Sequence, residues 1–256
     1  MSERFPLLSV IMPAYNAARF IGDAIHSIQE QNYPRLEVIV VDDGSTDATR
    51  EVVANHQSGI RYIRQENQGP ASARNTGLHL ARGSLITFLD ADDIWTPDAL
   101  DLLTQPLHDN PEISVVLGRV QYARLHSDGK GKRRMETFGH PCISFSLDAG
   151  VFRRQVFEQV GALDANLHSS EDVDWFMRAR EAGVFIDALD AVVLFYRRHG
   201  CNLTQDRGAS HRDLAHALKQ SLDRRRRSNT ASSLPSLAAD PSAARPSAEE
   251  LKANRR

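Results

Sequence analysis

Short apolar runs alternate with longer segments of helical periodicity over the first hundred residues, and this alternation constrains the fold most strongly. The apolar runs predict strands at Leu7–Met12, Leu36–Val41, Ile60–Ile63 and Leu85–Leu89. The intervening segments predict helices at Phe20–Gln31, from the Ser45-Thr46 cap to Asn55, and at Pro70–Ala81, with another opening at Thr96-Pro97. Because the strands are apolar on both faces, they need helices on both sides. The pattern therefore predicts a doubly wound α/β domain with a parallel sheet.

The pattern changes after about residue 110. Further strands are predicted at Ile113–Val120, Ser144–Phe152, Val184–Ile186 and Val192–Tyr196, and further helices at Arg154–Val160, Val173–Ala182 and Arg212–Arg227. The polar Gly/Lys/Arg stretch Ser127–His140 predicts a mobile loop. Residues 229–256 are rich in Ser, Ala, Pro and charge, so they lack the apolar area to offset the entropy of ordering and predict a disordered tail. We expect one domain over residues 1–228, in two halves that divide near residue 110.

Composition excludes several classes of protein. A formal net charge of −2 gives no electrostatic basis for nucleic-acid binding. Two cysteines, Cys142 and Cys201, are too few for a disulfide scaffold or a structural zinc site. The first residues do not resemble a signal peptide, and no apolar run approaches the ~20 residues that span a bilayer. We expect a soluble, cytoplasmic protein, in which Arg224–Arg227 solubilise a helix end or, alternatively, make peripheral contact with anionic lipid.

Polar residues lie at the ends of two predicted strands and at the start of one predicted helix in the first half, where an α/β sheet binds its ligands. Pro13-Ala14-Tyr15-Asn16 ends the first strand, and it is either a simple turn or a turn that presents an aromatic ring to a flat base. Asp42 ends the second strand, where turn chemistry and acceptance of a uracil imide N–H are equally good interpretations. Arg74 lies in the first turns of the helix after Gly69, as a surface arginine or as a ligand of anionic groups.

The strongest local signal is Asp90-Ala91-Asp92-Asp93, directly after a buried apolar strand. Carboxylates placed so close together repel one another, and burying them without compensation shifts their pKa values or costs several kcal/mol. A divalent cation removes the difficulty, since Mg²⁺ is commonly held by one or two carboxylates together with substrate phosphates. The alternative, solvated acids that cap the next helix, accounts for Asp93 better than for Asp90 and Asp92.

Two later segments also carry chemistry. Glu171 and Asp172 precede a helix, where acids either favour the helix dipole or supply a general base beside an acceptor that stacks on Trp175. His199 follows the last strand, and a histidine of this kind is more often a packed side chain than a ligand.

Together these segments resemble the family 2 glycosyltransferases, which have the GT-A fold. The resemblance covers about Leu7 to Asn202 and rests on Pro-Ala-Tyr-Asn, Val-Asp-Asp-Gly-Ser-Thr-Asp, Gly-Pro-Ala-Ser-Ala-Arg-Asn-Thr-Gly, Leu-Asp-Ala-Asp-Asp and Glu-Asp-Val-Asp-Trp in this order. It implies a nucleotide-binding half over about 1–110 and an acceptor-binding half over about 111–228. The residues implied for the nucleotide are Pro13, Ala14, Tyr15, Asn16, Asp42, Arg74, Asp90 and Ala91. The resemblance further implies Asp92 and His199 as metal ligands, Asp172 as the catalytic base with Glu171 beside it, and Trp175 as an acceptor contact.

The implied reaction is inverting transfer of a sugar from a nucleotide diphosphate, with a UDP-sugar favoured as donor, to a hydroxyl of a glycan, a lipid-linked acceptor or a small molecule. Mn²⁺ or Mg²⁺ would neutralise the leaving diphosphate, and the base would take the acceptor's proton. The Gln-x-x-Arg-Trp segment of the family's processive synthases does not follow Glu171-Asp172, which favours a single transfer.

Two alternatives belong to other classes. A nucleotidyltransferase would use a similar core, but it needs a Gly-rich basic loop after the first strand, and Pro13–Phe20 has no glycine and only Arg19. A non-catalytic nucleotide-sugar-binding protein would not need both Asp92 and Asp172. A transfer or hydrolysis assay separates these alternatives.

Overall fold

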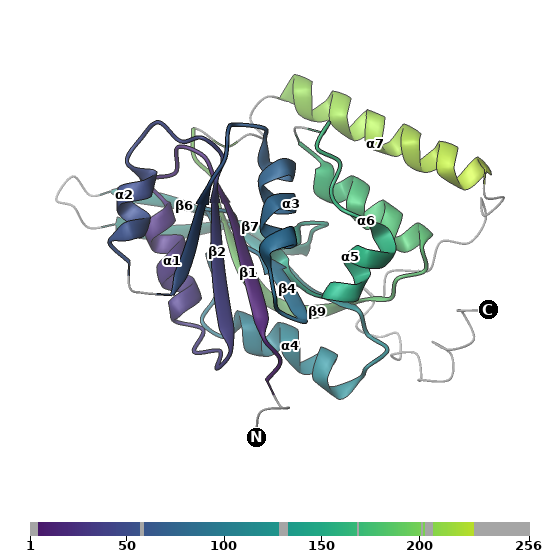
Figure 1. Cartoon of the computed structure of the whole chain (residues 1–256), viewed down its shortest axis with the longest axis horizontal. Coiled ribbons are helices and arrows are strands. Elements are labelled where there is room, and N and C mark those ends of the chain that lie inside the picture. Colours follow the sequence, from purple (N-terminus) through teal and green to yellow (C-terminus); the bar gives the residue numbers. More distant parts are fainter. Residues whose placement is uncertain are drawn as a thin grey trace.

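The computed structural model describes residues 5–56, 59–127, 133–167, 169–200, 202 and 207–227. One nine-stranded sheet runs through this part of the chain in the order β3-β2-β1-β4-β8-β6-β9-β5, and β7 pairs with β6 outside this path. The sheet and the helices that cover it form the mixed α/β fold expected from the sequence (Figure 1).

The first half of the sheet is parallel, as predicted. Its strands are β1 (Leu8–Ala14), β2 (Leu36–Asp42), β3 (Ile60–Arg64) and β4 (Leu85–Phe88). Its helices are α1 (Ile21–Gln29), α2 (Thr49–Ala54), α3 (Pro70–Leu80) and α4 (Ala99–Asp109). Because β1, β2 and β4 run in one direction, their carboxyl ends lie at the same edge of the sheet.

The second half makes the sheet mixed rather than purely parallel. Its strands are β5 (Ile94–Trp95), β6 (Val115–Ser127), β7 (Arg133–Ile143), β8 (Gly150–Arg153) and β9 (Ile186–Arg197). Its helices are the 3₁₀ turn η1 (Leu147–Ala149), α5 (Arg154–Val160), α6 (Glu171–Glu181) and α7 (Arg207–Arg227). Strand β8 is antiparallel to both β4 and β6, whereas β9 is parallel to β6. The two halves therefore share one sheet.

The prediction of a loop over Ser127–His140 is wrong for the described residues. Strand β6 runs to Ser127, and β7 begins at Arg133 and pairs with it in antiparallel register. The rings of Tyr122 and Phe138 stack across the two strands with their centroids 5.9 Å apart. The strands are polar because much of this hairpin is exposed, so they lack the apolar alternation that marks a half-buried strand.

Three boundaries also differ from prediction. The predicted strand Ser144–Phe152 is a 3₁₀ turn followed by the short β8. The two predicted strands Val184–Ile186 and Val192–Tyr196 are one strand, β9, whose pairing with β6 shifts register between Leu117 and Val120. Helix α7 begins at Arg207 rather than Arg212. The predicted tail over 229–256 lies outside the described residues.

Two apolar cores pack on the sheet. One contains α1 and α4 side chains such as Ile25 and Leu103, and the other contains residues of α3, α5 and α6. Alternate residues of β1 belong to different cores, with Val10 in the first and Ile11 in the second, as the period of a strand requires. Gly77 lets α3 approach this strand closely, because a Cβ at this position would lie 2.3 Å from the Ile11 Cγ2 atom. Among the described residues, no helix is both long and apolar enough to cross a membrane.

Candidate active site

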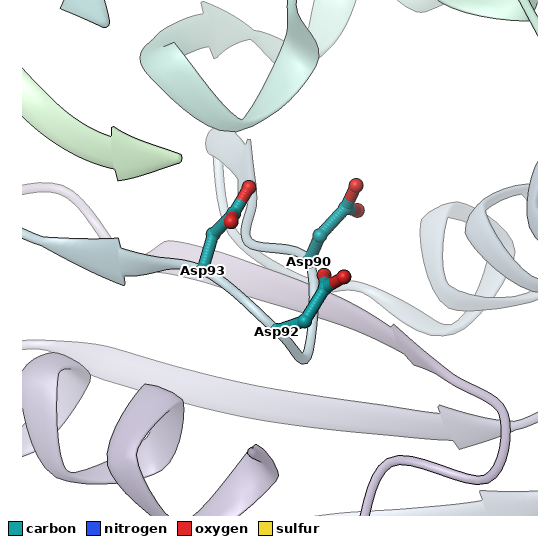
Figure 2. A group of neighbouring side chains, drawn as sticks. All are labelled: Asp90, Asp92 and Asp93. Atoms are coloured by element: carbon teal, nitrogen blue, oxygen red, sulfur yellow. The ribbon is translucent and has the colours of Figure 1, made fainter. Parts of the chain in front are cut away.

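Three acidic residues lie in one turn at the carboxyl edge of the sheet. Strand β4 ends at Phe88, and a tight turn follows in which the Asp93 N–H donates to the Asp90 carbonyl oxygen over 3.0 Å. One oxygen each from Asp90, Asp92 and Asp93 lie within 4.8 Å of one another. Figure 2 shows the three side chains projecting from this single turn.

The environment of this turn disfavours the ionised form of its carboxyl groups. Burial raises the pKa of Asp90, and the neighbouring Asp92 charge adds to the effect, although Arg74 opposes it. Burial together with the charges of Asp92 and Asp148 raises the pKa of Asp93 well above its usual range. Clustered oxygen ligands that disfavour their own ionisation fit a hard divalent cation, which would offset the repulsion between them.

Asp92 is held from the other side by residues that follow β9. The His199 Nε2 atom lies 3.0 Å from the Asp92 Oδ2 atom, and the Asn202 amide donates to the same oxygen over 3.2 Å. The Asn202 side chain in turn accepts the His199 backbone N–H over 2.6 Å. The imidazole stacks on the Phe20 ring with the centroids 4.1 Å apart, which fixes its plane. The structure thus brings together the two residues predicted as metal ligands, Asp92 and His199.

Arg197 holds the acidic turn, the end of β9 and α1 together. The side chain is 1% exposed, and its guanidinium donates to the Asp92 carbonyl oxygen, to the Asp23 carboxylate over 2.8 Å and to the Phe20 carbonyl oxygen over 3.1 Å. Its backbone N–H donates to Asp93 over 2.8 Å. Burial lowers the pKa of Arg197, but its ion pair with Asp23 favours the charged form. The end of β9, α1 and the acidic turn are therefore connected through one side chain.

Arg74 connects the acidic turn to the second half of the chain. Its guanidinium donates to Asp90 over 2.5 Å and also to Glu171, the first residue of α6. Arg74 and Glu171 are both buried. This contact places Asp172, the next residue, near the edge of the sheet that carries the acidic turn.

Asp172 has the electrostatics of a proton acceptor held in a low-dielectric environment. Burial is the main cause, and the charge of Glu171 the second, of a rise in the pKa of Asp172 to about 8. Arg74 and a hydrogen bond from the Val173 N–H oppose this rise. A carboxylate with a raised pKa is a stronger base than a solvated one, as general-base catalysis requires.

Four residues predicted for the nucleotide lie at the end of β1. Two of them, Pro13 and Ala14, belong to the strand, and the other two, Tyr15 and Asn16, follow it. Tyr15 is 53% exposed at the end of β1, where its ring is accessible to a ligand. Asn16 has φ of 48°, and its side chain accepts the backbone N–H of Thr46 over 2.8 Å, which fastens the loop after β1 to the loop after β2. Pro13 and Ala14 are buried within β1, with Ala14 at its last position.

The carboxylate of Asp42 is buried and accepts hydrogen bonds from other residues of the protein. It is 1% exposed, accepts the Ser45 N–H over 2.7 Å and also accepts the Tyr62 hydroxyl. These are the contacts of a residue that shapes the loop after β2. Binding of a base by Asp42 stays a prediction.

Trp175 does not have the predicted role. The side chain is 0% exposed, and its ring packs against Phe152, Phe157 and Phe176. The indole N–H donates to the Gly161 carbonyl oxygen over 3.0 Å. Its position one turn into α6 directs it to the core rather than to the acceptor, so its contribution is to fix α6 and with it Asp172.

Three residues at the site were not predicted. Arg197 and Asn202 lie in the segment around His199, but an arginine and an asparagine after a strand have no distinctive sequence pattern. Asp148 lies in η1 and is 2% exposed, and burial followed by the charge of Asp90 raises its pKa to about 6. No sequence signal marks Asp148, because it falls in the segment predicted as strand.

The sequence model of the family described as "Glycosyl transferase family 2" matches residues 9–161. A Bacillus subtilis (strain 168) protein named as the teichuronic acid biosynthesis glycosyltransferase TuaG is 39% identical over 153 residues, which are 58% of this chain and 58% of that protein. The chain thus spans only part of the length of the curated relatives it matches.

Two solved structures have the same fold. The mannosyltransferase PcManGT from Pyrobaculum calidifontis, in complex with GDP-Man and Mn²⁺, aligns with a TM-score of 0.66 at 23% identity, over 86% of this chain and 65% of that one. S. aureus TarS 1-349, in complex with UDP-GlcNAc, aligns with a TM-score of 0.65 at 22% identity, over 78% and 61%. The fold is the GT-A type, and the match to the family model covers more than half of the sequence. The chain belongs to glycosyl transferase family 2.

Proposed function

We propose that this chain is an inverting, metal-dependent glycosyltransferase that makes a single transfer from a nucleotide diphosphate sugar, with a UDP-sugar favoured, to an acceptor hydroxyl. One observation carries the proposal. The acidic turn held by His199 and the candidate base Asp172 converge on one edge of the sheet, and Arg74 bridges Asp90 and Glu171 between them.

The acidic turn would hold the cation. Asp92 is the proposed main ligand, because its carboxylate is partly exposed and already lies against His199. Mn²⁺ or Mg²⁺ bound there would supply Lewis acidity that neutralises charge on the leaving diphosphate. Arg197 and Asn202 would keep Asp92 in position through their contacts with its carbonyl and carboxylate oxygens.

The loop after β1 would receive the nucleotide. Tyr15 offers an exposed ring for the base, and Asn16 keeps the two loops together. TarS was solved with UDP-GlcNAc and PcManGT with GDP-Man, so both bases occur on this fold. UDP is favoured for this chain on the sequence resemblance alone, because Asp42 would have to give up its contacts with Ser45 and Tyr62 to accept an imide N–H.

Asp172 would take the proton from the acceptor hydroxyl as its oxygen attacks the anomeric carbon. The nucleotide diphosphate leaves from the opposite face of the sugar, so a single displacement inverts the anomeric configuration. Glu171 is occupied by Arg74 and is better suited to orient α6 than to exchange protons.

A donor screen tests the proposal. UDP-, dTDP- and GDP-sugars are incubated with the full chain and Mn²⁺ or Mg²⁺, and release of the nucleoside diphosphate is followed. We expect release from at least one donor, lost on chelation and in Asp172→Asn, and retained in Asp98→Asn, which changes an exposed acid outside the acidic turn. Formation of a nucleotide sugar from a nucleoside triphosphate would instead support a nucleotidyltransferase. Donor binding without turnover on any acceptor would support a non-catalytic protein.

A further inference from the structure

Helix α7 packs on α6 through polar and small side chains along one side. The Arg224 guanidinium forms ion pairs with Glu181 over 2.6 Å and with Asp174 over 3.3 Å. Near its other end, the Asp213 carboxylate accepts the Ser169 N–H over 2.9 Å. Ala217, between them, is 0% exposed. Figure 1 shows α7 lying along the outside of α6, at the margin of the molecule. One face of α7 is therefore fixed to the protein, and the other faces outward.

The outward face carries a stripe of leucines. Leu214, Leu218 and Leu222 are spaced four residues apart, so they lie on one side of the helix. They are 37%, 45% and 49% exposed. Only two other large apolar side chains in the described part of the chain, Tyr15 and Leu102, are as exposed. Three exposed leucines on one helix face need a covering surface more than scattered single ones do.

Basic side chains run along one side of this stripe. Helix α7 has six arginines and one lysine against two aspartates, whereas the whole chain has a net charge of −2. Arg212, Lys219 and Arg226 are exposed and spaced seven residues apart, so they form a second row along α7, in which Lys219 and Arg226 neighbour Leu222. The two acids of α7 do not balance its seven basic residues: the Asp213 carboxylate accepts the Ser169 N–H, and Asp223 forms an ion pair with Arg226 over 3.9 Å. An apolar stripe beside a basic row is typical of a helix that lies in a membrane interface.

We propose that this outward face of α7 binds the surface of an anionic phospholipid bilayer, with the leucines in the headgroup boundary and the basic side chains on lipid phosphates. Two other occupants fit the charge poorly. Residues 228–256 have four basic and three acidic residues, so they bring no acidic surplus to a basic helix. A second copy of this chain, paired through the same face, would oppose two basic helices.

Membrane binding through α7 would also favour one class of acceptor. Helix α6, on which α7 packs, begins at Glu171 and Asp172, so a bilayer against α7 would hold the acceptor side of the site near the membrane. This favours a lipid-linked acceptor among the three acceptor classes expected from the sequence. That consequence rests on the proposed function, whereas lipid binding by α7 does not.

Vesicle co-sedimentation tests the proposal with the full chain. We expect binding to vesicles that contain phosphatidylglycerol, much weaker binding to phosphatidylcholine alone, and release at high salt. Each basic residue near an anionic surface strengthens binding about fivefold, so Arg212→Gln/Lys219→Gln/Arg226→Gln should weaken it on the order of 100-fold. Leu214→Gln/Leu218→Gln/Leu222→Gln should weaken it tenfold or more.

Matched controls use residues of the same type elsewhere. Arg50→Gln/Arg61→Gln/Arg134→Gln removes three exposed charges, and Leu102→Gln removes an exposed leucine, without touching α7. Both should bind like the wild type. Because all the substituted residues are exposed, circular dichroism should show every variant folded.

Three results would overturn the proposal. The first is equal binding to neutral and anionic vesicles, or no binding. The second is unchanged binding by both α7 variants. The third is self-association without lipid that the leucine variant abolishes, which would assign the face to a second copy. Lipid binding without donor turnover would contradict the proposed function but not the proposed lipid binding by α7.

Discussion

Arg74 and Glu171 form a buried ion pair between residues 97 positions apart in the sequence. The same guanidinium also pairs with Asp90, so one side chain joins the acidic turn after β4 to the start of α6. The pair connects the start of α6, which carries Asp172, to the acidic turn, and it compensates the buried Glu171 carboxylate.

Removing Arg74 should destabilise the protein strongly. Arg74→Gln leaves the buried Glu171 carboxylate without its cation, which typically costs about 3–5 kcal/mol, and also removes the partner of the partly exposed Asp90. Thermal or urea unfolding measures the loss. Arg82→Gln is the control, because Arg82 pairs with Glu37 at the surface, and it should change stability by less than about 1 kcal/mol. Equal effects of the two substitutions would show that the ion pair with Glu171 is unimportant.

Asp172→Asn should abolish most of the turnover. Loss of a general base typically lowers the rate by about 10²–10⁴-fold, and donor binding should change little because the proposed role of Asp172 is toward the acceptor. Glu171→Gln should cost less. Near-normal turnover of Asp172→Asn, or NMR showing a product with retained anomeric configuration, would rule out the assignment of Asp172.

The pH dependence of kcat/KM should report the environment of Asp172. Its folded pKa of about 8 is raised, chiefly by burial, so the ionised base is the minor form at neutral pH. The rate should therefore rise with pH and level off above that pKa. The charged groups that act on Asp172 are Glu171 and Asp148, which raise the pKa, and Arg74, which lowers it. Glu171→Gln should thus move the rise to lower pH. A rise that stays in place, or moves to higher pH, would contradict this electrostatic account.

The residues after Arg227 should be dispensable for the fold and for catalysis. Residues 228–256 have no aromatic residue and few apolar ones, so they contribute little to a core. A protein truncated after Arg227 should keep its melting temperature and turnover. A fall in the melting temperature of several degrees would show that this segment packs on the domain.

The first half of the fold could be predicted from the sequence because its elements are buried on regular periods. Strands β1, β2 and β4 are apolar on both faces, and Pro70 opens α3 at its expected position. The hairpin β6–β7 could not be predicted, since its pairing depends on contacts such as Tyr122 with Phe138, which form only across the strands.

Some residues of the site could likewise be predicted from the sequence, and others could not. Asp92 follows a buried strand, so its position could be predicted, and the structure places His199 against it. Trp175 was misassigned because an aromatic residue near two acids has the same sequence pattern whether it faces the core or an acceptor. Asp148 and Arg197 could not be found, since their roles depend on burial beside residues that are distant in the sequence.

Isothermal titration calorimetry of UDP tests most directly the claim that Asp92 holds a divalent cation for the donor. The titration is made on the wild type with Mn²⁺, on the wild type with chelator, and on Asp92→Asn with Mn²⁺, with Asp98→Asn as the control at an exposed acid. The proposal predicts tight binding only for the wild type and Asp98→Asn with Mn²⁺, and at least tenfold weaker binding in the other two titrations. Equal UDP affinity in all four would contradict it.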